Sequence, residues 1–572
     1  MDKNKNTTNS QLKNISESKY LKGKLPLLWL AIAIFLVFSK SLFFDYIYFD
    51  DNLLIKENLF NLKKISYISH AFKEDVFNLN GQGSYYRPVF TVTLILDAII
   101  GNGNFGWFHF TNIILHIIAS YFVFLLFLEL SYRRKKSFIF SFIFALHPII
   151  TQAVVWIPGR NDSLLAVFLL PSIIYFIKYL KTNSVKYIFL HLIFFILAIL
   201  TKETAVIFIL IGGFYSYFIL KKSSKKYLLL YSAWIPVLAL WYIVRKFAMC
   251  INPEVSFLEI IKTIPGIFSY LGKIIFPFNL SVLPVMEDIY FSIIIGIIAT
   301  LILIYFINKD KEKRLNFLFL GILWFVCFLV PSFLIKFTND VVFSEHRAYI
   351  PLIGVLIMLM EIRLPVKADS TDKNLKTVSF IVIIILAATS FIYSLKFKDK
   401  FTFWENAVKT SPSNSFNYTN IGSLYCKDEK YEIAENYLKE ALKIHENDFL
   451  ANTNLGYICM KTHRDKEAQQ YFLKEIKYNP NCSDAYLFLG LLYMRSANNP
   501  DSIAIICWKK AIEINPHKSD AYYELALYYT FKRNNEALEE LKKKSSKYLI
   551  DQQIFKTCED KIRNFRKHGT LK

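Results

Sequence analysis

Long apolar runs separated by short polar segments dominate the first 400 residues of the chain. A helix that crosses the hydrocarbon core of a membrane needs about 20 apolar residues. By that rule the pattern predicts eleven spans, near residues 25–44, 107–130, 137–155, 163–180, 186–201, 204–220, 227–247, 290–307, 315–336, 348–364 and 377–396. We therefore expect an all-α, polytopic membrane helical bundle over residues 25–396.

The distribution of lysine and arginine orients these spans. With the polar, Lys-rich residues 1–24 as a cytoplasmic tail, every inner loop is basic, as cytoplasmic loops generally are. The inner loops are Arg133–Lys136, Lys178–Lys186, Lys221–Lys226, Lys309–Arg314 and Lys367–Lys376. The alternation holds only if the apolar stretches Pro88–Ile100 and Phe257–Phe278 do not cross, so we expect both to lie at the outer interface. Everything after residue 396 then lies outside.

The region after about residue 400 repeats. Glycines recur at a period of about 34 residues, which is typical of tetratricopeptide repeats. The repeated small residues are Gly422, Gly456 and Gly490, followed by Ala434, Ala468 and Ala504. We predict a tetratricopeptide α-solenoid over residues 397–549 and a basic C-terminal tail over residues 550–572. Such an array indicates a helical binding surface without naming its ligand.

Composition agrees with a membrane protein, because 54% of the residues are hydrophobic, 17% are aromatic and the mean hydropathy is +0.32. The net charge of +22 is explained by the inner loops. No basic stripe is interleaved with stacking aromatics outside the spans, so we expect no nucleic-acid partner. Seven cysteines fall singly, with no CxxC pair and no zinc spacing, and we interpret them as packing residues.

The predicted topology brings ionisable and polar side chains to the outer face, where such residues are energetically costly and usually functional. The candidates are Asp50, Asp51, Tyr86, Arg87, His109, His147, Arg160, Asp162, Lys202, Glu203, Glu345, His346 and Arg347. Plainer interpretations stay open. The two aspartates could cap a helix at Asn52–Glu57, Lys202 and Glu203 could be a snorkelling pair at a span end, and His147 could simply mark the end of a span.

The chemistry of this set suits glycosyl transfer from a polyprenyl phosphate. The acceptor hydroxyl needs a carboxylate base, which an aspartate of the first loop can supply. The leaving lipid phosphate must be neutralised as its charge develops, with arginine preferred for bidentate contact. The candidate phosphate-binding residues are Arg87, Arg160, Lys202 and Arg347, although the two later arginines could instead be interface anchors. A divalent cation held by Asp50 or Asp51 could share this work, and the sequence does not decide its presence.

Several segments resemble the TMTC proteins, the transmembrane and tetratricopeptide repeat-containing mannosyltransferases. These are "FDDN", "YYRPVF", "FHFTNIILH", "ALHPIITQAVVWIPGRNDSLLA", "LTKETAV" and "EHRAYIPLIG". The order of parts, a membrane region followed by repeats, is also similar, and the resemblance runs from about residue 40 to 545. More broadly the chain is similar to the protein O-mannosyltransferase branch of the GT-C glycosyltransferases.

This resemblance implies inverting transfer of mannose or another hexose from a polyprenyl-phosphate sugar to Ser or Thr of a protein acceptor held by the repeats. It maps the acidic first-loop motif onto Asp50 and Asp51, and we favour Asp50 as base because it leads the pair. His346 separates Glu345 from Arg347, whereas the family usually has the two adjacent. The short repeat array and the composition favour a bacterial relative, in the cell inner membrane.

Two other classes of function remain. A non-catalytic membrane anchor could present the repeats as a scaffold for envelope proteins, in which case the outer charges would be dispensable. A transporter or flippase is less consistent with the pattern, because its site should lie near the membrane midplane.

Overall fold

The computed structural model describes residues 23–77, 85–221, 224–249, 261–309, 314–333, 342–362, 371–495, 501–548 and 552–568. Every regular element among these residues is a helix. The chain divides into two compact units, Met1–Ser411 and Pro412–Lys572. Most of the predicted tail 1–24 and part of the predicted inner loop Lys367–Lys376 lie outside the described residues. Helix α19 (Lys400–Thr410), which falls inside the predicted repeat domain 397–549, belongs to the first unit.

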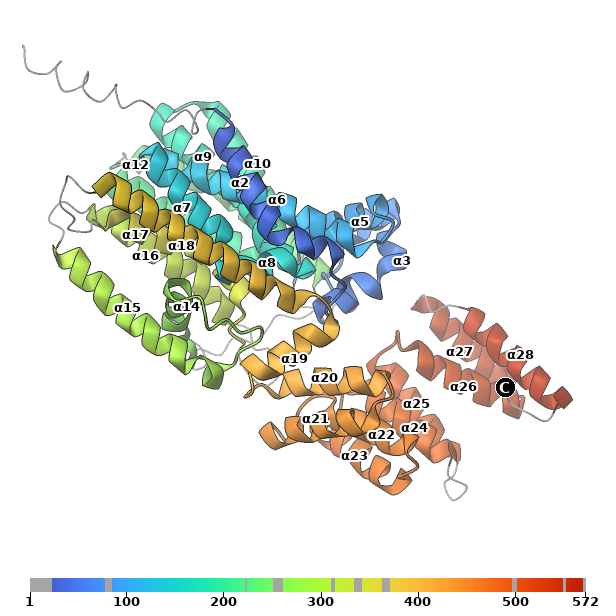
Figure 1. Ribbon diagram of the computed structural model, residues 1–572. Coiled ribbons are helices and arrows are strands. Elements are labelled where there is room, and N and C mark those ends of the chain that lie inside the picture. The colour runs from blue at the N-terminus through green and yellow to red at the C-terminus, as the bar shows by residue number, and fades with distance from the viewer. Residues whose placement is uncertain are drawn as a thin grey trace, which may run out of the picture. The chain divides into compact units, whose positions relative to one another are not determined.

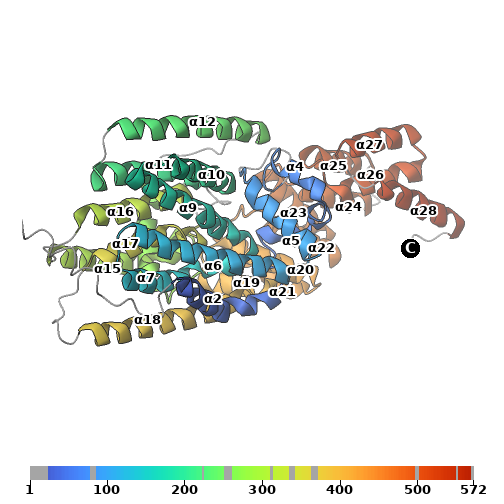
Figure 2. The same cartoon turned by 90° about the horizontal axis from the view of Figure 1, so that it is seen from above.

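Long apolar helices of the first unit run alongside one another (Figures 1 and 2). They are α2 (Leu25–Phe38), α6 (Phe105–Glu129), α7 (Arg134–Leu146), α9 (Arg160–Thr182), α10 (Val185–Thr201), α11 (Phe208–Phe214), α12 (Ser224–Ala248), α15 (Tyr290–Lys309), α16 (Leu315–Leu329), α17 (Pro351–Glu361) and α18 (Thr371–Ser394). Helix α9 packs against α6 and α10, and α16 packs against α17. The last pair approaches closely at Gly321 and Gly354, where a Cβ on either residue would lie within 2.7 Å of the other's carbonyl oxygen.

Six helices are long and apolar enough to cross a membrane: Leu25–Phe43, Phe105–Glu129, Ile157–Thr182, Met286–Lys309, Leu315–Phe333 and Thr377–Phe397. A seventh candidate is the pair Arg134–Leu146 and Pro148–Val155, bent by 50°. The bend lies where Pro148 cannot donate a backbone hydrogen bond. These helices indicate a multi-pass membrane protein. A helix lies at each of the eleven predicted positions, but several are shorter, so six or seven spans are what their length and composition support.

Short helices join the long ones, and α3, α5 and α8 among them lie toward one end of the bundle in Figure 1. They are η2 (Ser39–Phe43), η3 (Asn52–Lys56), α3 (Leu59–Leu62), η4 (Ile65–Tyr67), α4 (Ile68–Ala71), α5 (Pro88–Ile100), η5 (Pro148–Ile150), α8 (Thr151–Val155), η6 (Ile157–Gly159), η7 (Glu203–Ile207), α14 (Pro265–Ile275), η9 (Met286–Ile289), η10 (Val330–Phe333), η11 (Glu345–Ala348) and η12 (Leu395–Phe397). Helix α8 contacts η11, α6 and α18. Helix α5 has the bounds of the first predicted interface helix, and α14 lies within the second; their place at a membrane surface stays a prediction.

A polar clamp joins helix ends at the opposite end of the bundle, with η8 (Tyr215–Ile219) following α11 there. Arg314, just before α16, donates to both oxygens of Glu361, at 2.6 and 3.0 Å. The hydroxyl of Tyr132, between α6 and α7, donates to the same carboxylate at 2.6 Å. The clamp therefore joins the start of α16, the end of α17 and the turn between α6 and α7.

The second unit is a series of helix pairs. They are α20 (Ser415–Lys427) with α21 (Tyr431–Ile444), α22 (Ala451–Lys461) with α23 (Asp465–Tyr478), α24 (Ser483–Arg495) with α25 (Asp501–Ile514), and α26 (Ser519–Lys532) with α27 (Asn535–Lys547), followed by α28 (Gln553–His568). A Cβ on Gly456 would lie 2.5 Å from the Phe472 ring, and one on Gly490 would lie 2.5 Å from Trp508. The repeated glycines thus occupy the points of close helix approach, as a tetratricopeptide-like array requires.

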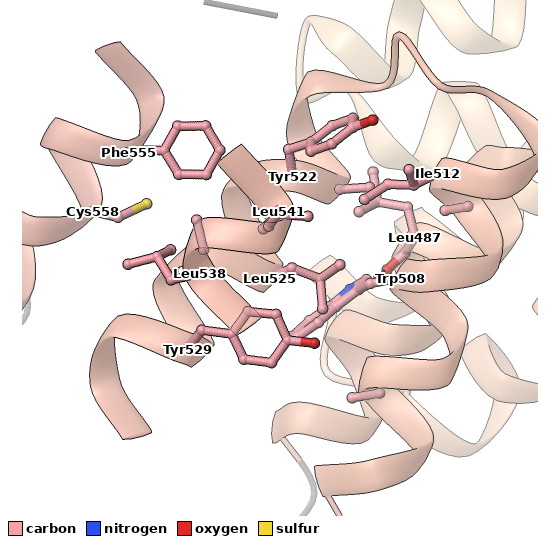
Figure 3. Close-up of a cluster of buried hydrophobic side chains, with 14 residues drawn as sticks. Leu487, Trp508, Ile512, Tyr522, Leu525, Tyr529, Leu538, Leu541, Phe555 and Cys558 are labelled. Atoms are coloured by element: carbon pink, nitrogen blue, oxygen red, sulfur yellow. Dashed lines mark hydrogen bonds between the residues drawn. The ribbon is translucent and has the colours of Figure 1, made fainter. Parts of the chain in front are cut away.

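The last helix closes the hydrophobic core of this unit. Helix α28 packs on α26, and its Phe555 and Cys558 join the cluster built around Trp508, Leu525 and Leu538 (Figure 3). Most of the segment predicted as a basic tail is therefore helical, because apolar residues at helical spacing give it one face that can be buried.

Candidate active site

The first loop of the membrane unit, between η2 and η3, is organised by Asp51. Its carboxylate accepts the backbone N–H of Ile47 at 2.7 Å and that of Phe49 at 2.9 Å, and the side chain is 1% exposed. These bonds satisfy backbone donors in a turn that includes Tyr48 at φ +59°. Asp51 precedes η3 but makes no side-chain capping bond to it. Asp51 therefore does not cap the helix that follows it. Its side chain instead stabilises the backbone of the preceding loop.

Asp50 differs from its neighbour. It is half-buried, and its carboxylate has no hydrogen-bond or ion-pair partner among the residues that the structure describes. Burial raises the pKa of Asp50 to about 7; the charge of Asp51 also raises it, and that of Arg87 lowers it. A carboxylate that binds a proton near neutral pH and is not occupied by the protein has the properties of a general base.

Aromatic contacts hold this loop in place. The ring of Phe49 stacks on Trp156 with centroids 5.4 Å apart, and its edge meets Trp404 of α19 at 5.8 Å. The Trp404 indole N–H donates to the carbonyl of Ile47 at 2.9 Å. The loop that carries Asp50 is thus fixed both by the α8 segment and by the helix that follows the last candidate span.

Three of the four predicted phosphate ligands meet near one imidazole. Burial lowers the pKa of His346 well below its ordinary value, and the charges of Lys202, Arg347 and Arg87 lower it further. Each cation has a partner. Arg87 donates to both oxygens of Glu203, at 2.8 and 3.3 Å, Lys202 lies 2.7 Å from Asp162, and Arg347 donates to the carbonyls of Ser332 and Val342. The site therefore combines a free carboxylate with a group of cations.

The fourth predicted ligand, Arg160, is fully buried and occupied by the protein. Its guanidinium pairs with Asp97 of α5 at 2.6 Å and donates to Asn112 at 2.7 Å and to the carbonyl of Phe108 at 2.8 Å. Asn112 in turn donates to the carbonyls of Val154 and Trp156. These bonds give Arg160 a structural role that ties α5, α6 and the α8 segment together.

Glu345 is also held by the protein. The buried carboxylate accepts from the Lys273 ammonium at 2.9 Å, the backbone N–H of Ser281 at 2.6 Å and the Tyr393 hydroxyl at 2.7 Å. The sequence prediction missed Lys273, which lies on α14. The one feature that could have indicated it is its charge inside an otherwise apolar stretch. This network fixes the start of η11 and so the positions of His346 and Arg347.

Two further predicted site residues, His147 and Tyr86, form hydrogen bonds to the protein backbone. The His147 ring lies 2.9 Å from the carbonyl of Ile274 and accepts the backbone N–H of Ile149. The Tyr86 hydroxyl donates to the carbonyl of Phe72 at 3.1 Å. Within the described ranges, no group of three or more His, Cys, Asp or Glu side chains is arranged to hold a metal ion.

Buried polar atoms without a protein partner cluster close to the loop. In the described part of the chain they include both ring nitrogens of His109, Nε2 of Gln152, Nε1 of Trp156, Oδ2 of Asp162 and Nδ1 of His346. The sequence prediction missed Gln152 and Trp156, although both lie in the segment "LHPIITQAVVWIPGRND". A buried tryptophan and glutamine look like packing residues until their unpaired atoms are located.

No family model matches the chain. It is similar to a protein O-mannosyl-transferase of Caenorhabditis elegans, 23% identical over 70% of this chain and 60% of that protein, and to TMTC3 of Homo sapiens, 21% identical over 72% and 50%. A shorter match to TMTC2 of Mus musculus is 31% identical over 26% of this chain and 18% of that protein. The chain thus spans about half the length of the human and mouse TMTC3 proteins that it matches.

Among solved structures, the chain is similar to YrrB, described as a TPR protein with an unusual peptide-binding site. The identity is 20% over 33% of this chain and 96% of that chain, with a TM-score of 0.23. The match to yeast Tom70 is 13% identical over 76% and 93%, with a TM-score of 0.25. Over about 70% of its length the chain is a distant homologue of the TMTC protein O-mannosyl-transferases.

Proposed function

We propose that the protein is a membrane glycosyltransferase that transfers mannose or another hexose from a polyprenyl-phosphate donor to Ser or Thr of a protein acceptor. The observation that carries the proposal is the half-buried carboxylate of Asp50, which has no hydrogen-bond or ion-pair partner among the described residues. The charge of Arg87 acts on this carboxylate, and Arg87 also acts on His346 together with Lys202 and Arg347. The distant similarity to protein O-mannosyl-transferases supports the same reaction class.

In the proposed reaction, Asp50 takes the proton of the acceptor hydroxyl as its oxygen forms a bond to C1 of the sugar. The bond between C1 and the phosphate oxygen breaks, and its electron pair leaves with the lipid phosphate. A single displacement of this kind inverts the configuration at C1. Arg87, Lys202 and Arg347 would neutralise the departing phosphate, because cations are most effective where negative charge develops in a low-dielectric site.

The two aspartates therefore have different proposed roles. Asp50 is the base, and Asp51 holds the backbone of the loop through its bonds to Ile47 and Phe49. Arg160 falls outside the proposed phosphate set, because Asp97 and its other partners occupy its guanidinium.

We also propose eleven spans, with the site and the repeats on the extracytoplasmic side of a bacterial inner membrane. Support comes from the basic residues of the inner loops that the sequence predicts, such as Arg133–Lys136 and Lys178–Lys186. The repeats would hold the protein acceptor. A divalent cation remains compatible with the acidic first loop, and no step above requires one.

The test uses the full-length protein in lipid vesicles, with a labelled polyprenyl-phosphate hexose and a Ser/Thr peptide. Asp50→Asn should abolish transfer while expression and thermal stability persist. Asp45→Asn is the matched control, since this exposed residue lies in the same loop and accepts only the backbone N–H of Tyr46 in the described chain. Full activity of Asp50→Asn would refute the proposed mechanism and favour the membrane scaffold.

A further inference from the structure

Four polar side chains near the Asp50 loop carry buried atoms that the protein does not satisfy. They are Gln152 (0% exposed), Trp156 (5%), Asp162 (3%) and the partly exposed His346. Their unpaired atoms, within the residues described, are Nε2, Nε1, Oδ2 and Nδ1 respectively. Burying a polar atom without a partner is energetically costly, so four such atoms in linked residues indicate that something else satisfies them.

Contacts between these residues place them together. The backbone N–H of His346 donates to Oε1 of Gln152 at 3.2 Å, and the rings of His346 and Trp156 lie 5.3 Å apart. The Trp156 ring also stacks on Phe49, the neighbour of Asp50. Lys202, whose charge acts on His346, holds only the first carboxylate oxygen of Asp162. These contacts therefore link the four residues to one another and to the loop that carries the proposed base.

The existing bonds fix the chemical character of these atoms. Because Oε1 of Gln152 already accepts a bond, its amide nitrogen is left as a donor, and the indole nitrogen of Trp156 can only donate. The free oxygen of Asp162 accepts. A neutral imidazole at His346 offers one donor and one acceptor. The group thus offers both donors and acceptors, which matches hydroxyl groups, since each hydroxyl both donates and accepts.

Other ligands fit this group less well. A phosphate would meet the negative charge of Asp162, and the cations near His346 already bond to Asp162, Glu203 or backbone carbonyls. A metal ion would find one carboxylate oxygen and one imidazole nitrogen, fewer than the three or more protein ligands usual for zinc. Ordered water could satisfy the atoms singly and is the remaining alternative.

We propose that Gln152, Trp156, Asp162 and His346 form a subsite that binds the hydroxyl groups of the transferred hexose. This inference rests on the proposed function, and it assigns sugar recognition to residues separate from the base and the phosphate-binding cations. A site built to bond a hydroxyl discriminates strongly against a sugar lacking it, because the protein atoms are then left unpaired. The subsite would accordingly determine which hexose is transferred.

The test measures binding and transfer separately, with the full-length protein in nanodiscs. The probes are polyprenyl-phosphate mannose, glucose and galactose, and the sugarless polyprenyl phosphate. At least one hexose carrier should bind more tightly than the sugarless carrier. Trp156→Phe keeps the stacking on Phe49 and removes one donor, and it should weaken binding of that hexose carrier about 3- to 10-fold while leaving the sugarless carrier unchanged.

Gln152→Leu provides a second variant with the same expected pattern, and Trp107→Phe is the control, since Trp107 is 38% exposed on α6. Equal binding of all four carriers, or unchanged hexose preference in both variants, would overturn the subsite and leave water as the occupant. If the variants behave as expected but no hexose reaches any acceptor, the subsite stands and the proposed transferase function fails. If transfer occurs without sugar-dependent binding, the subsite alone fails.

Discussion

Arg87 should set the pH range in which the protein works. The proposed base Asp50 can take a proton only when it is ionised, so we expect activity to be lost as the pH falls through its pKa of about 7. The ionised fraction is then about 0.1 at pH 6 and about 0.9 at pH 8, which predicts an increase in kcat of roughly tenfold between them. Arg87→Gln removes a charge that lowers this pKa, so the rise in activity should move to higher pH. In this variant the Glu203 carboxylate also loses its Arg87 partner, and its negative charge should raise the pKa of Asp50 further.

The assay is the pH dependence of transfer at saturating donor, with the full-length protein in lipid vesicles. Working at saturation separates this shift from weaker donor binding, which would raise KM and leave the pH profile of kcat in place. Arg133→Gln, on an exposed chain reversal at the far end of the bundle, is the matched control. A profile whose midpoint does not move in Arg87→Gln, or moves to lower pH, would refute the electrostatic assignment of Asp50.

Three further predictions concern the fold. Lys273→Met leaves the buried Glu345 carboxylate without its counter-charge and should destabilise the protein by about 3–5 kcal/mol. Thermal unfolding in detergent measures this loss, and an unchanged midpoint would contradict a close ion pair between Lys273 and Glu345. Gly456→Leu should unfold the repeat unit, because a Cβ there already lies 2.5 Å from Phe472, and limited proteolysis would detect it; resistance equal to wild type would contradict the close approach. A reporter fused after Lys396 should be extracytoplasmic, and a cytoplasmic signal would contradict the proposed orientation.

Periodic features of this chain could be predicted from the sequence. The apolar runs locate the helices, and the spacing of Gly422, Gly456 and Gly490 identifies the repeats because their role is local to one helix pair. The bounds of α5 could also be predicted, since Pro88 and Gly101 enclose one apolar stretch. Each of these features depends on residues that are close together in the sequence, so one sequence is enough to predict it.

Roles that depend on distant contacts could not be predicted. Arg160 looked like a phosphate ligand, because nothing in its own segment reveals that Asp97, 63 positions earlier, meets its guanidinium. Asp50 and Asp51 were equivalent by composition, and only the backbone bonds of Asp51 separate them. The number of spans was likewise ambiguous, because helices such as Val185–Thr201 are too short for length alone to decide.

The bond from Trp404 to Ile47 has a consequence for biosynthesis. It joins residues 357 positions apart, so the loop that carries Asp50 emerges early and lacks one of its supports until almost the whole membrane unit has been made. At about 5–20 residues per second, the delay is roughly 20–70 s. A nascent chain interrupted before residue 404 would insert its first helices without this support for the loop. In such a chain Asp50 would lie on a loop that lacks the hydrogen bond from Trp404.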